Sequence, residues 1–386
     1  MPQDFSQYWS LDPTVTYLNH GSFGATPTAV LAVQAELRRE MELEPVDFLV
    51  RRLPARLDRA RQALAAFVGA DPADLVFVPN ATTGVNAVLR SQAFAPGDEL
   101  LTTNHVYAAC RKTLEFIASR SGAKVIVATV PFPIGGDEEI VTAVLEAVTS
   151  RTRLALLDHV TSPTALIYPL QRLVEELHSR GVDTLVDGAH APGMLPLDLA
   201  SLGATYYTGN AHKWLCAPKG AAFLFVRRDR QAVLHPSAIS HGFLKGYHAE
   251  FDWTGTCDPT AWLCVPEAIR YLGSLLPGGW PEVMAANHAL AVRARSLLCE
   301  ALRVAPPCPE TMLGSMASIP LPTARKGSPA DRLDSDGLSS WFRERGVETW
   351  LHPWPLPVIR VSAQLYNHTS QYQRLAGLLD EALNGG

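Results

Sequence analysis

The sequence lacks several patterns that define other protein classes. It has no run of five or more basic residues, and 33 Lys and Arg against 38 Asp and Glu give a net charge of -5, which argues against a nucleic-acid-binding surface. No apolar stretch reaches the roughly 18 residues that span a bilayer. The N-terminus has no basic and then apolar profile of a signal peptide. These absences predict a soluble, cytoplasmic protein that binds neither nucleic acid nor membrane.

The cysteines also lack the arrangements that build metal sites. The six cysteines form no CxxC pair and have no metal-ligand spacing, so they are predicted to be buried thiols in a reducing compartment, without a metal. What the chain does have is size and apolar content. Its 386 residues, 47% hydrophobic and 18% charged, are enough for two domains, or for one large and one subsidiary domain.

Short apolar segments alternate with amphipathic ones through the first half of the chain. This pattern is typical of a mostly parallel sheet that helices cover on both faces. Ligands of such sheets bind outside the carboxyl ends of the strands. The predicted strands are residues 74–79, 99–103, 124–130, 154–157, 184–186 and 204–207, and the predicted helices are residues 28–44, 54–69, 80–90, 108–120, 138–149 and 170–180.

The pattern changes after residue 220. Residues 220–226 predict a strand that can reverse direction, and residues 235–260 predict an irregular functional or interface segment rich in Gly, His and aromatic residues. Helices and short strands then mix, which favours a small α+β domain. The predicted helices are residues 260–276, 281–304, 335–344 and 370–383, and the predicted strands are residues 314–320, 347–351 and 358–361, with a linker at residues 326–329.

Lys213 lies in an unusual setting, between a histidine and a tryptophan and with few charges nearby. A desolvated lysine loses its proton readily and can attack a carbonyl to form an imine. A solvated loop lysine is the commoner alternative. Upstream, however, a strand that reads as buried ends in the acid Asp187. Pyridoxal 5′-phosphate (PLP) needs both a Schiff-base lysine and an acid that pairs with its pyridine nitrogen, so the two residues together point to this cofactor.

A polar turn after the first predicted strand suits an anion. Asn80-Ala-Thr-Thr-Gly84 leads into a helix, where free N–H groups, hydroxyls and the helix dipole favour a phosphate. Threonine is also a common N-cap residue, so a plain helix start is the alternative. Several polar residues follow predicted strand ends in this way and are expected on one rim of the sheet: Thr82, the segment 105–107, Ser162, Asp187 and Lys213.

Residues 18–27 carry two glycines and a proline, which argue against regular structure and favour a close backbone approach. The polar pair Asn19 and His20 could line a substrate pocket. Equally, the segment could be a turn into the helix at residues 28–44, with Thr26 and Pro27 at its start. Both interpretations stay open at this point.

With Thr82-Thr83-Gly84, Asp187-Gly-Ala-His190 and His212-Lys213-Trp214 in this order, the chain resembles fold-type I PLP enzymes. Within them it resembles the class V aminotransferase group, in particular its isopenicillin N epimerase-like branch. Sequence motifs of that branch are spread over almost the whole chain, at residues 17–24, 210–214, 253–258 and 359–367. The resemblance implies an N-terminal arm (1–20), a PLP-binding large domain (21–262) and a small C-terminal domain (263–386).

The resemblance also implies a role for each site residue. Lys213 would bind PLP and move the Cα proton, and Asp187 would pair with the ring nitrogen. Tyr107 would stack on the ring, with His105 as the alternative, and Arg360 would clamp the substrate carboxylate. The ring hydroxyl would contact His190 and Ser162, the phosphate would contact Thr82, Thr83, Asn210 and His212, and Thr256 would reach the phosphate of a second subunit in a homodimer.

Several reactions fit this set of residues. A cysteine desulfurase needs a mobile cysteine just before the carboxylate-binding arginine, and residues 350–357 contain none. The family likeness favours an amino-acid epimerase or racemase with Lys213 as one base and His20, Tyr107 or a water as the second acid. A C–S β-lyase or an aminotransferase is the alternative, and a PLP- or amine-binding protein without turnover is the third. Candidates for the substrate pocket are Phe48, Arg51, Arg52, Trp253 and Trp354, with Arg51 and Arg52 more often solvated charges.

Overall fold

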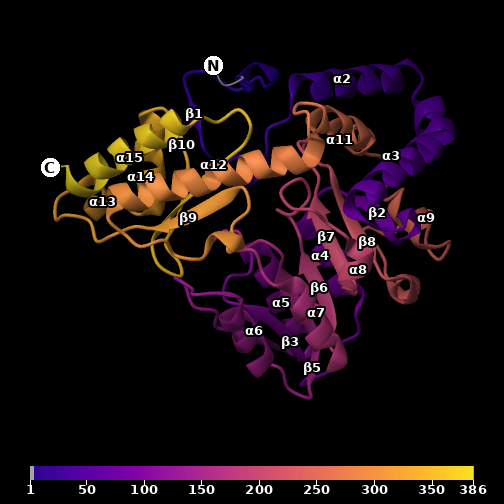
Figure 1. Cartoon of the computed structure of the whole chain (residues 1–386). Helices are drawn as coiled ribbons and strands as arrows, with labels where there is room; N and C mark the ends of the chain where they lie inside the picture. The colour runs from indigo at the N-terminus through magenta and orange to yellow at the C-terminus, as the bar shows by residue number, and fades with distance from the viewer. Residues whose placement is uncertain (1–3, 386) are drawn as a thin grey trace.

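A seven-stranded sheet forms the centre of the N-terminal two thirds of the chain in the computed structural model, which describes residues 4–385 (Figure 1). Its strand order is β2-β8-β7-β6-β5-β3-β4. Neighbouring strands among β7, β6, β5, β3 and β4 pair in parallel. Strand β8 runs antiparallel to both of its neighbours, β7 and β2. The bounds are β2 Leu75–Val78, β3 Glu99–Thr103, β4 Lys124–Ala128, β5 Thr152–Asp158, β6 Asp183–Asp187, β7 Tyr206–Asn210 and β8 Ala222–Val226. The predicted mostly parallel sheet and the reversal after residue 220 are confirmed.

Helices cover both faces of this sheet because successive side chains of a strand point to opposite sides. Leu154 and Leu156 of β5 pack in the cluster of α4 and α5, whereas Ala155 and Leu157 pack with α3, α6 and α7. Both faces are therefore apolar, as the uninterrupted hydrophobic strands predict. The helix bounds are α2 Thr28–Leu43, α3 Leu53–Val68, α4 Ala81–Ser91, α5 Ala108–Ser121, α6 Asp137–Glu146, α7 Leu170–Ser179 and α8 Leu199–Leu202.

The C-terminal part has its own antiparallel sheet, in the order β11-β12-β9. The long helix α12 runs from the central sheet's side of the molecule across to this part, where it packs on α15 and β9 (Figure 1). The bounds are α10 Thr260–Leu263, α11 Val265–Gly273, α12 Gly279–Leu302, α13 Pro329–Arg332, α14 Ser335–Glu344, α15 Thr369–Asn384, β9 Met316–Pro320, β10 Val347–Glu348, β11 Trp350–His352 and β12 Val358–Ser362. The predicted small mixed α and β architecture is confirmed.

Several local predictions are wrong. The segment predicted as irregular at residues 18–27 contains the one-turn helix α1 His20–Phe23, and the irregular stretch 235–260 contains α9 Tyr247–Phe251. The predicted helix at residues 260–276 is two helices, α10 and α11, because Pro266 has no N–H to continue the first one. Cys257 is exposed, unlike the other five cysteines.

The N-terminal arm joins the C-terminal part through β1 Thr16–Tyr17, which pairs in parallel with β10. Residues 1–3 of the predicted arm lie outside the described residues, and the domain limits at residues 20 and 262 stay predictions. None of the helices between residues 4 and 385 is both long and apolar enough to cross a membrane.

Candidate active site

A cavity of about 610 Å³ opens at the carboxyl ends of the central strands. Its walls come from the segments after β3, β5, β6 and β7, from the start of α4 and from residues 22–23 of α1. The predicted meeting of polar residues on one rim is confirmed for most of them, because the loops at the ends of parallel strands share one edge. The cavity lining includes Thr82, Thr83, Tyr107, Ser162, Asp187, His190, Asn210, His212 and Lys213.

Lys213 follows β7 in a tight loop, and its amine faces the cavity. Gly24, which ends α1, has a φ of +72°, and a Cβ there would collide with the backbone of His212, so only glycine lets this segment pack on the loop. The Lys213 Nζ lies 3.2 Å from His190 Nε2, while His190 Nδ1 accepts from Trp214 at 3.4 Å. The hydrogen of a neutral His190 is therefore on Nε2, and it can donate to a neutral amine.

Burial and the nearby Arg360 cation lower the pKa of Lys213 from 10.5 to about 7. A neutral amine is the form that attacks a carbonyl. We therefore expect the rate at which the apoprotein captures PLP to rise with pH up to about 7 and to level off above it. A lysine of ordinary pKa would instead keep gaining neutral amine up to about pH 10. Stopped-flow absorbance over a series of buffers measures this rate, and a curve still rising steeply above about pH 9 would contradict the shift.

Asp187 does not stand alone, because Asp158 lies beside it. The two residues end neighbouring parallel strands, and the register pairs Asp158 with Asp187. Both are buried. Asp187 accepts hydrogen bonds from the Cys110 thiol at 3.1 Å and from the Ala189 N–H at 3.0 Å, whereas Asp158 Oδ2 has no partner among the described residues.

Burial raises the pKa of both carboxyls, and that of Asp158 rises well above its usual range because the Asp187 charge adds to the burial. Asp158 therefore keeps the proton of the pair while Asp187 carries the charge. The pair suits a cationic group, such as a protonated ring nitrogen, at this end of the cavity. Asp158 is not among the predicted site residues, although it ends a hydrophobic strand in the same way as Asp187.

The start of α4 also lines this cavity. Asn80 caps the helix by accepting from the Thr83 N–H at 2.8 Å, and Asn210 Oδ1 accepts from the Ala81 N–H at 2.8 Å. His212 Nδ1 lies 2.9 Å from the Ala221 carbonyl, to which it donates. Helix N–H groups, two threonine hydroxyls and a positive dipole end make this place suitable for a phosphate.

Arg360 lies directly behind the cavity wall, on β12. Its Nη1 donates to the Ser162 carbonyl at 2.7 Å and to the Ser162 hydroxyl at 3.0 Å, and its Nη2 donates to the Ser22 hydroxyl at 3.1 Å. The Trp350 ring covers the guanidinium at 4.2 Å. Burial lowers the pKa of Arg360 to about 10, so the group stays cationic. The Ser22 and Ser162 contacts fix this planar group beside the cavity, and its role as the clamp of the substrate carboxylate stays a prediction.

Two predicted histidines do not reach the cavity. His20 is buried and donates to the Lys213 carbonyl at 3.1 Å while it accepts from Tyr366 at 2.8 Å. His105 accepts from Thr164 at 2.6 Å and donates to the Val130 carbonyl at 3.0 Å. The structure is therefore at odds with two predictions, that His20 lines the substrate pocket and that His105 is an alternative stacking residue. In each ring, both nitrogens are hydrogen-bonded to other groups of the protein.

Other predicted residues are not part of the cavity lining. Asn19 is buried, and its Oδ1 accepts from the Ser22 hydroxyl at 2.6 Å, so it orients a lining residue. Arg51 pairs with Glu44 and Asp47 on the surface, and Arg52 pairs with Glu40 and Asp47, as expected of solvated charges. Phe48 is buried. Within residues 4–385, no group of three His, Cys, Asp or Glu side chains is arranged to hold a metal ion.

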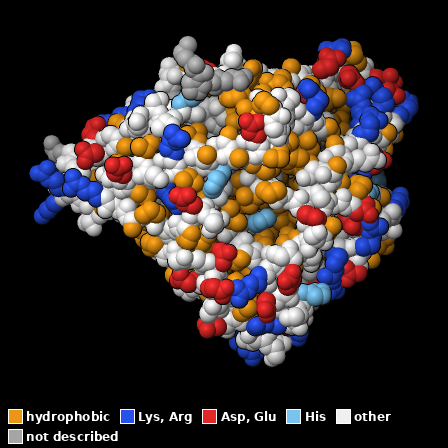
Figure 2. Space-filling view, in the orientation of Figure 1, with side chains coloured by type: hydrophobic (Ala, Val, Ile, Leu, Met, Phe, Trp, Pro, Cys, Tyr) orange, Lys and Arg blue, Asp and Glu red, His pale blue; other side chains and the backbone are white. Residues whose placement is uncertain are grey.

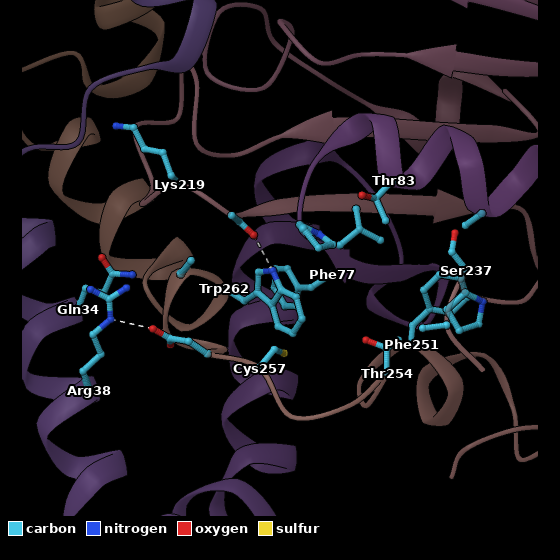
Figure 3. Close-up of a pocket in the computed structure, with 18 residues that line it drawn as sticks. Gln34, Arg38, Phe77, Thr83, Lys219, Ser237, Phe251, Thr254, Cys257 and Trp262 are labelled. Carbon is cyan, nitrogen blue, oxygen red and sulfur yellow. Dashed lines mark hydrogen bonds and ion pairs between the residues drawn. The ribbon is translucent and has the colours of Figure 1, made fainter. Parts of the chain in front are cut away.

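Figure 3 shows a second cavity, of about 460 Å³. It shares Pro79, Thr83 and Gly220 with the first one. Phe77, Phe251 and Trp262 give it an apolar wall, and an Arg38–Asp258 ion pair with a distance of 2.7 Å lies at its edge. Thr254 and Cys257 line it, whereas Thr256 between them is exposed and lines neither cavity. The structure therefore places Thr256 outside the site of its own chain.

Comparison with known proteins gives a family. The sequence model of the family described as aminotransferase class-V matches residues 26–373. The chain belongs to the class-V aminotransferase family. Class-V aminotransferases are PLP-dependent enzymes, which confirms the predicted cofactor.

Curated relatives of this class-V aminotransferase match nearly its whole length. It is 37% identical to isopenicillin N epimerase of Amycolatopsis lactamdurans, with 96% of each chain covered. It is 35% identical to isopenicillin N epimerase of Streptomyces clavuligerus, with 97% of this chain and 96% of that one covered. It is 30% identical to L-cysteine desulfhydrase of Arabidopsis thaliana, with 95% of this chain and 87% of that one covered.

Solved structures with the same fold include the cystine C–S lyase C-DES in complex with its product cysteine persulfide, with 21% identity, a TM-score of 0.79 and coverage of 96% of this chain and 98% of that one. Another is apo cysteine desulfurase from Thermococcus onnurineus NA1, with 19% identity, a TM-score of 0.81 and coverage of 100% and 99%. These likenesses confirm the predicted fold-type I architecture.

Proposed function

We propose that this class-V aminotransferase removes the Cα proton of an amino acid and returns a proton to the opposite face, as an epimerase or racemase. One observation carries the proposal: Lys213 and Tyr107 both line one cavity and follow strands that are not neighbours. Lys213 follows β7 and Tyr107 follows β3, and β6 and β5 lie between them. Three strand spacings separate the two origins by about 14 Å, which leaves room for a substrate between them.

The lining residues fit PLP at both ends. The Asp187 charge would hold the protonated ring nitrogen, with the unpartnered Asp158 oxygen beside it. Tyr107 would cover the ring, and His190 and Ser162 would meet its hydroxyl. The start of α4 would receive the phosphate, with Thr82, Thr83, Asn210 and His212 around it. When bound, PLP supplies an electron sink for the electron pair that remains at Cα after proton removal.

The protonation states of the two candidate groups support Lys213 as the base and Tyr107 as the acid. Lys213, with its pKa of about 7, is largely neutral just above that pH and can accept the Cα proton. Burial and the nearby Cys110 and Asp187 raise the pKa of the Tyr107 phenol, so it stays protonated and can donate. His20 is buried and cannot serve as the acid that returns a proton to Cα. Tyr107 or a water remains as this second acid.

The Tyr107→Phe variant, assayed in deuterated water, distinguishes proton removal by Lys213 from proton return on the opposite face of Cα. We expect it to keep Cα deuterium exchange within about tenfold of wild type, because Lys213 is intact. Inversion of configuration should fall by about 10²- to 10⁴-fold, the usual size of a general-acid contribution. Proton NMR follows exchange and polarimetry follows inversion, over a panel of amino acids. Equal loss of both rates would mean that Tyr107 only holds the cofactor.

A C–S β-lyase is the second candidate, because L-cysteine desulfhydrases are also relatives. This reaction needs the Lys213 base alone, with a leaving group at Cβ. Release of pyruvate and a thiol in the same panel, without inversion of any amino acid, would replace the epimerase proposal. An aminotransferase would use the same residues and would instead convert an added keto acid to an amino acid.

Cysteine desulfuration by a protein persulfide has little support. No cysteine precedes Arg360 in residues 350–357. Cys110 lies in the site, but burial and the Asp187 charge raise the pKa of its thiol well above the usual value, which makes it a poor nucleophile. Cys308 is buried, and its carbonyl accepts from Arg295 at 2.9 Å.

We further propose a homodimer in which Thr256 reaches the phosphate site of the second copy. Thr256 is exposed beside the cavity that adjoins Thr83. Large apolar side chains are exposed along the preceding segment: Val233, Ile239, Phe243 and Leu244. Figure 2 also shows hydrophobic side chains gathered in the middle of one face, with charges mainly toward its edges. Such surface is usually covered by a partner. Sedimentation equilibrium tests this, and a mass near 41.9 kDa at assay concentration would contradict it.

A further inference from the structure

A third cavity, of about 510 Å³, adjoins the active-site cavity. The two share Tyr107 and Ser162. Its far wall comes from β11 and the loop after it, through Trp350, His352 and Trp354. This is the segment where a desulfurase would need its cysteine, and here it carries aromatic rings instead.

The position of Arg360 connects the two cavities. The guanidinium donates to Ser162 in their shared wall and lies 4.2 Å from the centre of the Trp350 ring. Consider a substrate whose carboxylate binds Arg360 and whose Cα lies near Lys213. The third cavity then lies next to this substrate, on the side of Trp350. The residues shared by the two linings, Tyr107 and Ser162, lie between that space and the site of Lys213.

The walls of this third cavity offer mainly aromatic faces. Trp350 and His352 are alternate residues of β11, so they share one face of the strand, and their rings stack at 4.8 Å. The Trp354 ring is 40% exposed and packs edge-on against His105 at 5.9 Å. The polar groups are largely occupied: the Asn104 amide bonds both backbone groups of Val130, and His352 Nδ1 lies 2.6 Å from the Trp354 carbonyl.

The charged group in this lining is also partly neutralised. Arg111 pairs with Glu115 at 3.0 Å, four residues along α5, and both side chains are about one-third exposed. A small side chain such as that of alanine or cysteine would leave the aromatic faces in contact with water. An aromatic or long apolar side chain would cover them, which is favourable in proportion to the area removed from water.

We propose that this aromatic cavity binds the substrate's side chain and selects α-amino acids with a large, aromatic or extended apolar side chain. The inference rests on the proposed function only in the placement of the amino acid between Lys213 and Arg360, and it holds for inversion or elimination alike. Trp354 is then a specificity-determining residue, while Trp350 also covers Arg360.

Titration of the PLP-loaded protein with amino acids tests the proposal through the initial shift of the cofactor absorbance, recorded by stopped flow before turnover. The probes are L-alanine, L-phenylalanine and S-benzyl-L-cysteine. We expect the two large probes to bind at least about tenfold more tightly than alanine. Trp354→Ala should remove most of that preference and leave the alanine affinity unchanged. The control Phe116→Ala removes an aromatic ring of similar exposure, 41%, on the outer face of α5, and should change neither affinity.

The outcomes separate the two proposals. If no amino acid, alanine included, shifts the absorbance, the proposed function fails together with the inference. If alanine binds but the large probes bind no more tightly, only the aromatic side-chain site is wrong. An equal loss of affinity for all probes in Trp354→Ala would also overturn it, because that pattern means general damage to the site.

Discussion

Replacement of Lys213 by alanine is expected to abolish covalent retention of PLP and to lower the rate of Cα deuterium exchange by about 10³- to 10⁴-fold or more. The reason is that this amine is both the group that attacks the cofactor's carbonyl and the base that lies in the cavity. Its pKa of about 7 makes it reactive near neutral pH. Borohydride reduction followed by mass spectrometry detects the covalent bond, and NMR measures the exchange.

Lys219→Ala is the matched control for this variant. Lys219 belongs to the same loop region but lines the neighbouring cavity rather than the one that holds Lys213. It should keep both the covalent bond and the exchange rate. Retention of a reducible bond in Lys213→Ala, or its loss in Lys219→Ala, would show that another amine carries the cofactor.

The Asp187→Asn variant is expected to lower the exchange rate by about 10²- to 10³-fold, the cost of removing a preorganised charge. Asparagine keeps the shape, but its single oxygen can accept from only one of the two donors that now bond separate oxygens of Asp187, the Cys110 thiol and the Ala189 N–H. It also has no negative charge to hold a protonated ring nitrogen. Asp158→Asn should cost less than about tenfold, because that carboxyl is the one that stays protonated and an amide imitates it. Deuterium exchange at saturating amino acid measures both variants.

The control for these two changes is Asp183→Asn. Asp183 begins the same strand that Asp187 ends, and it pairs with Arg230 on the surface at 3.1 Å. It should leave the exchange rate unchanged. Were Asp158→Asn as damaging as Asp187→Asn, the charge would have to be shared between the two carboxyls, and our assignment of the proton to Asp158 would be wrong.

Much of the fold and part of the candidate site could be predicted from local sequence alone. Apolar strands between helices indicated the parallel sheet, and the polar residues just after each strand indicated which side chains share a rim. Lys213, Asp187 and the Thr82–Thr83 turn were found in this way, and they line one cavity. The resemblance to class-V aminotransferases then supplied Arg360, which composition and periodicity do not single out.

The rest depended on contacts between distant segments. A histidine beside a glycine reads as a possible ligand, but His20 is enclosed by Tyr366 and the Lys213 carbonyl, which lie 346 and 193 residues away. The same holds for His105, whose partner Thr164 is 59 residues away. Local sequence contains no information on such partners, so the two rings could not be assigned to the interior beforehand.

The sequence by itself determined the chemical groups and the strand ends that carry them: a lysine after one strand, an acid at the end of another, and a hydroxyl-rich turn before a helix. Only the tertiary structure decided their neighbours. Strand order set Lys213 and Tyr107 three strand spacings apart in the lining of one cavity, and register brought Asp158 beside Asp187. The position of β11 put Trp350 and His352 into the lining of the cavity that also contains Ser162. The physical reason is that chemistry belongs to single side chains, whereas pKa, orientation and access depend on what is packed around them.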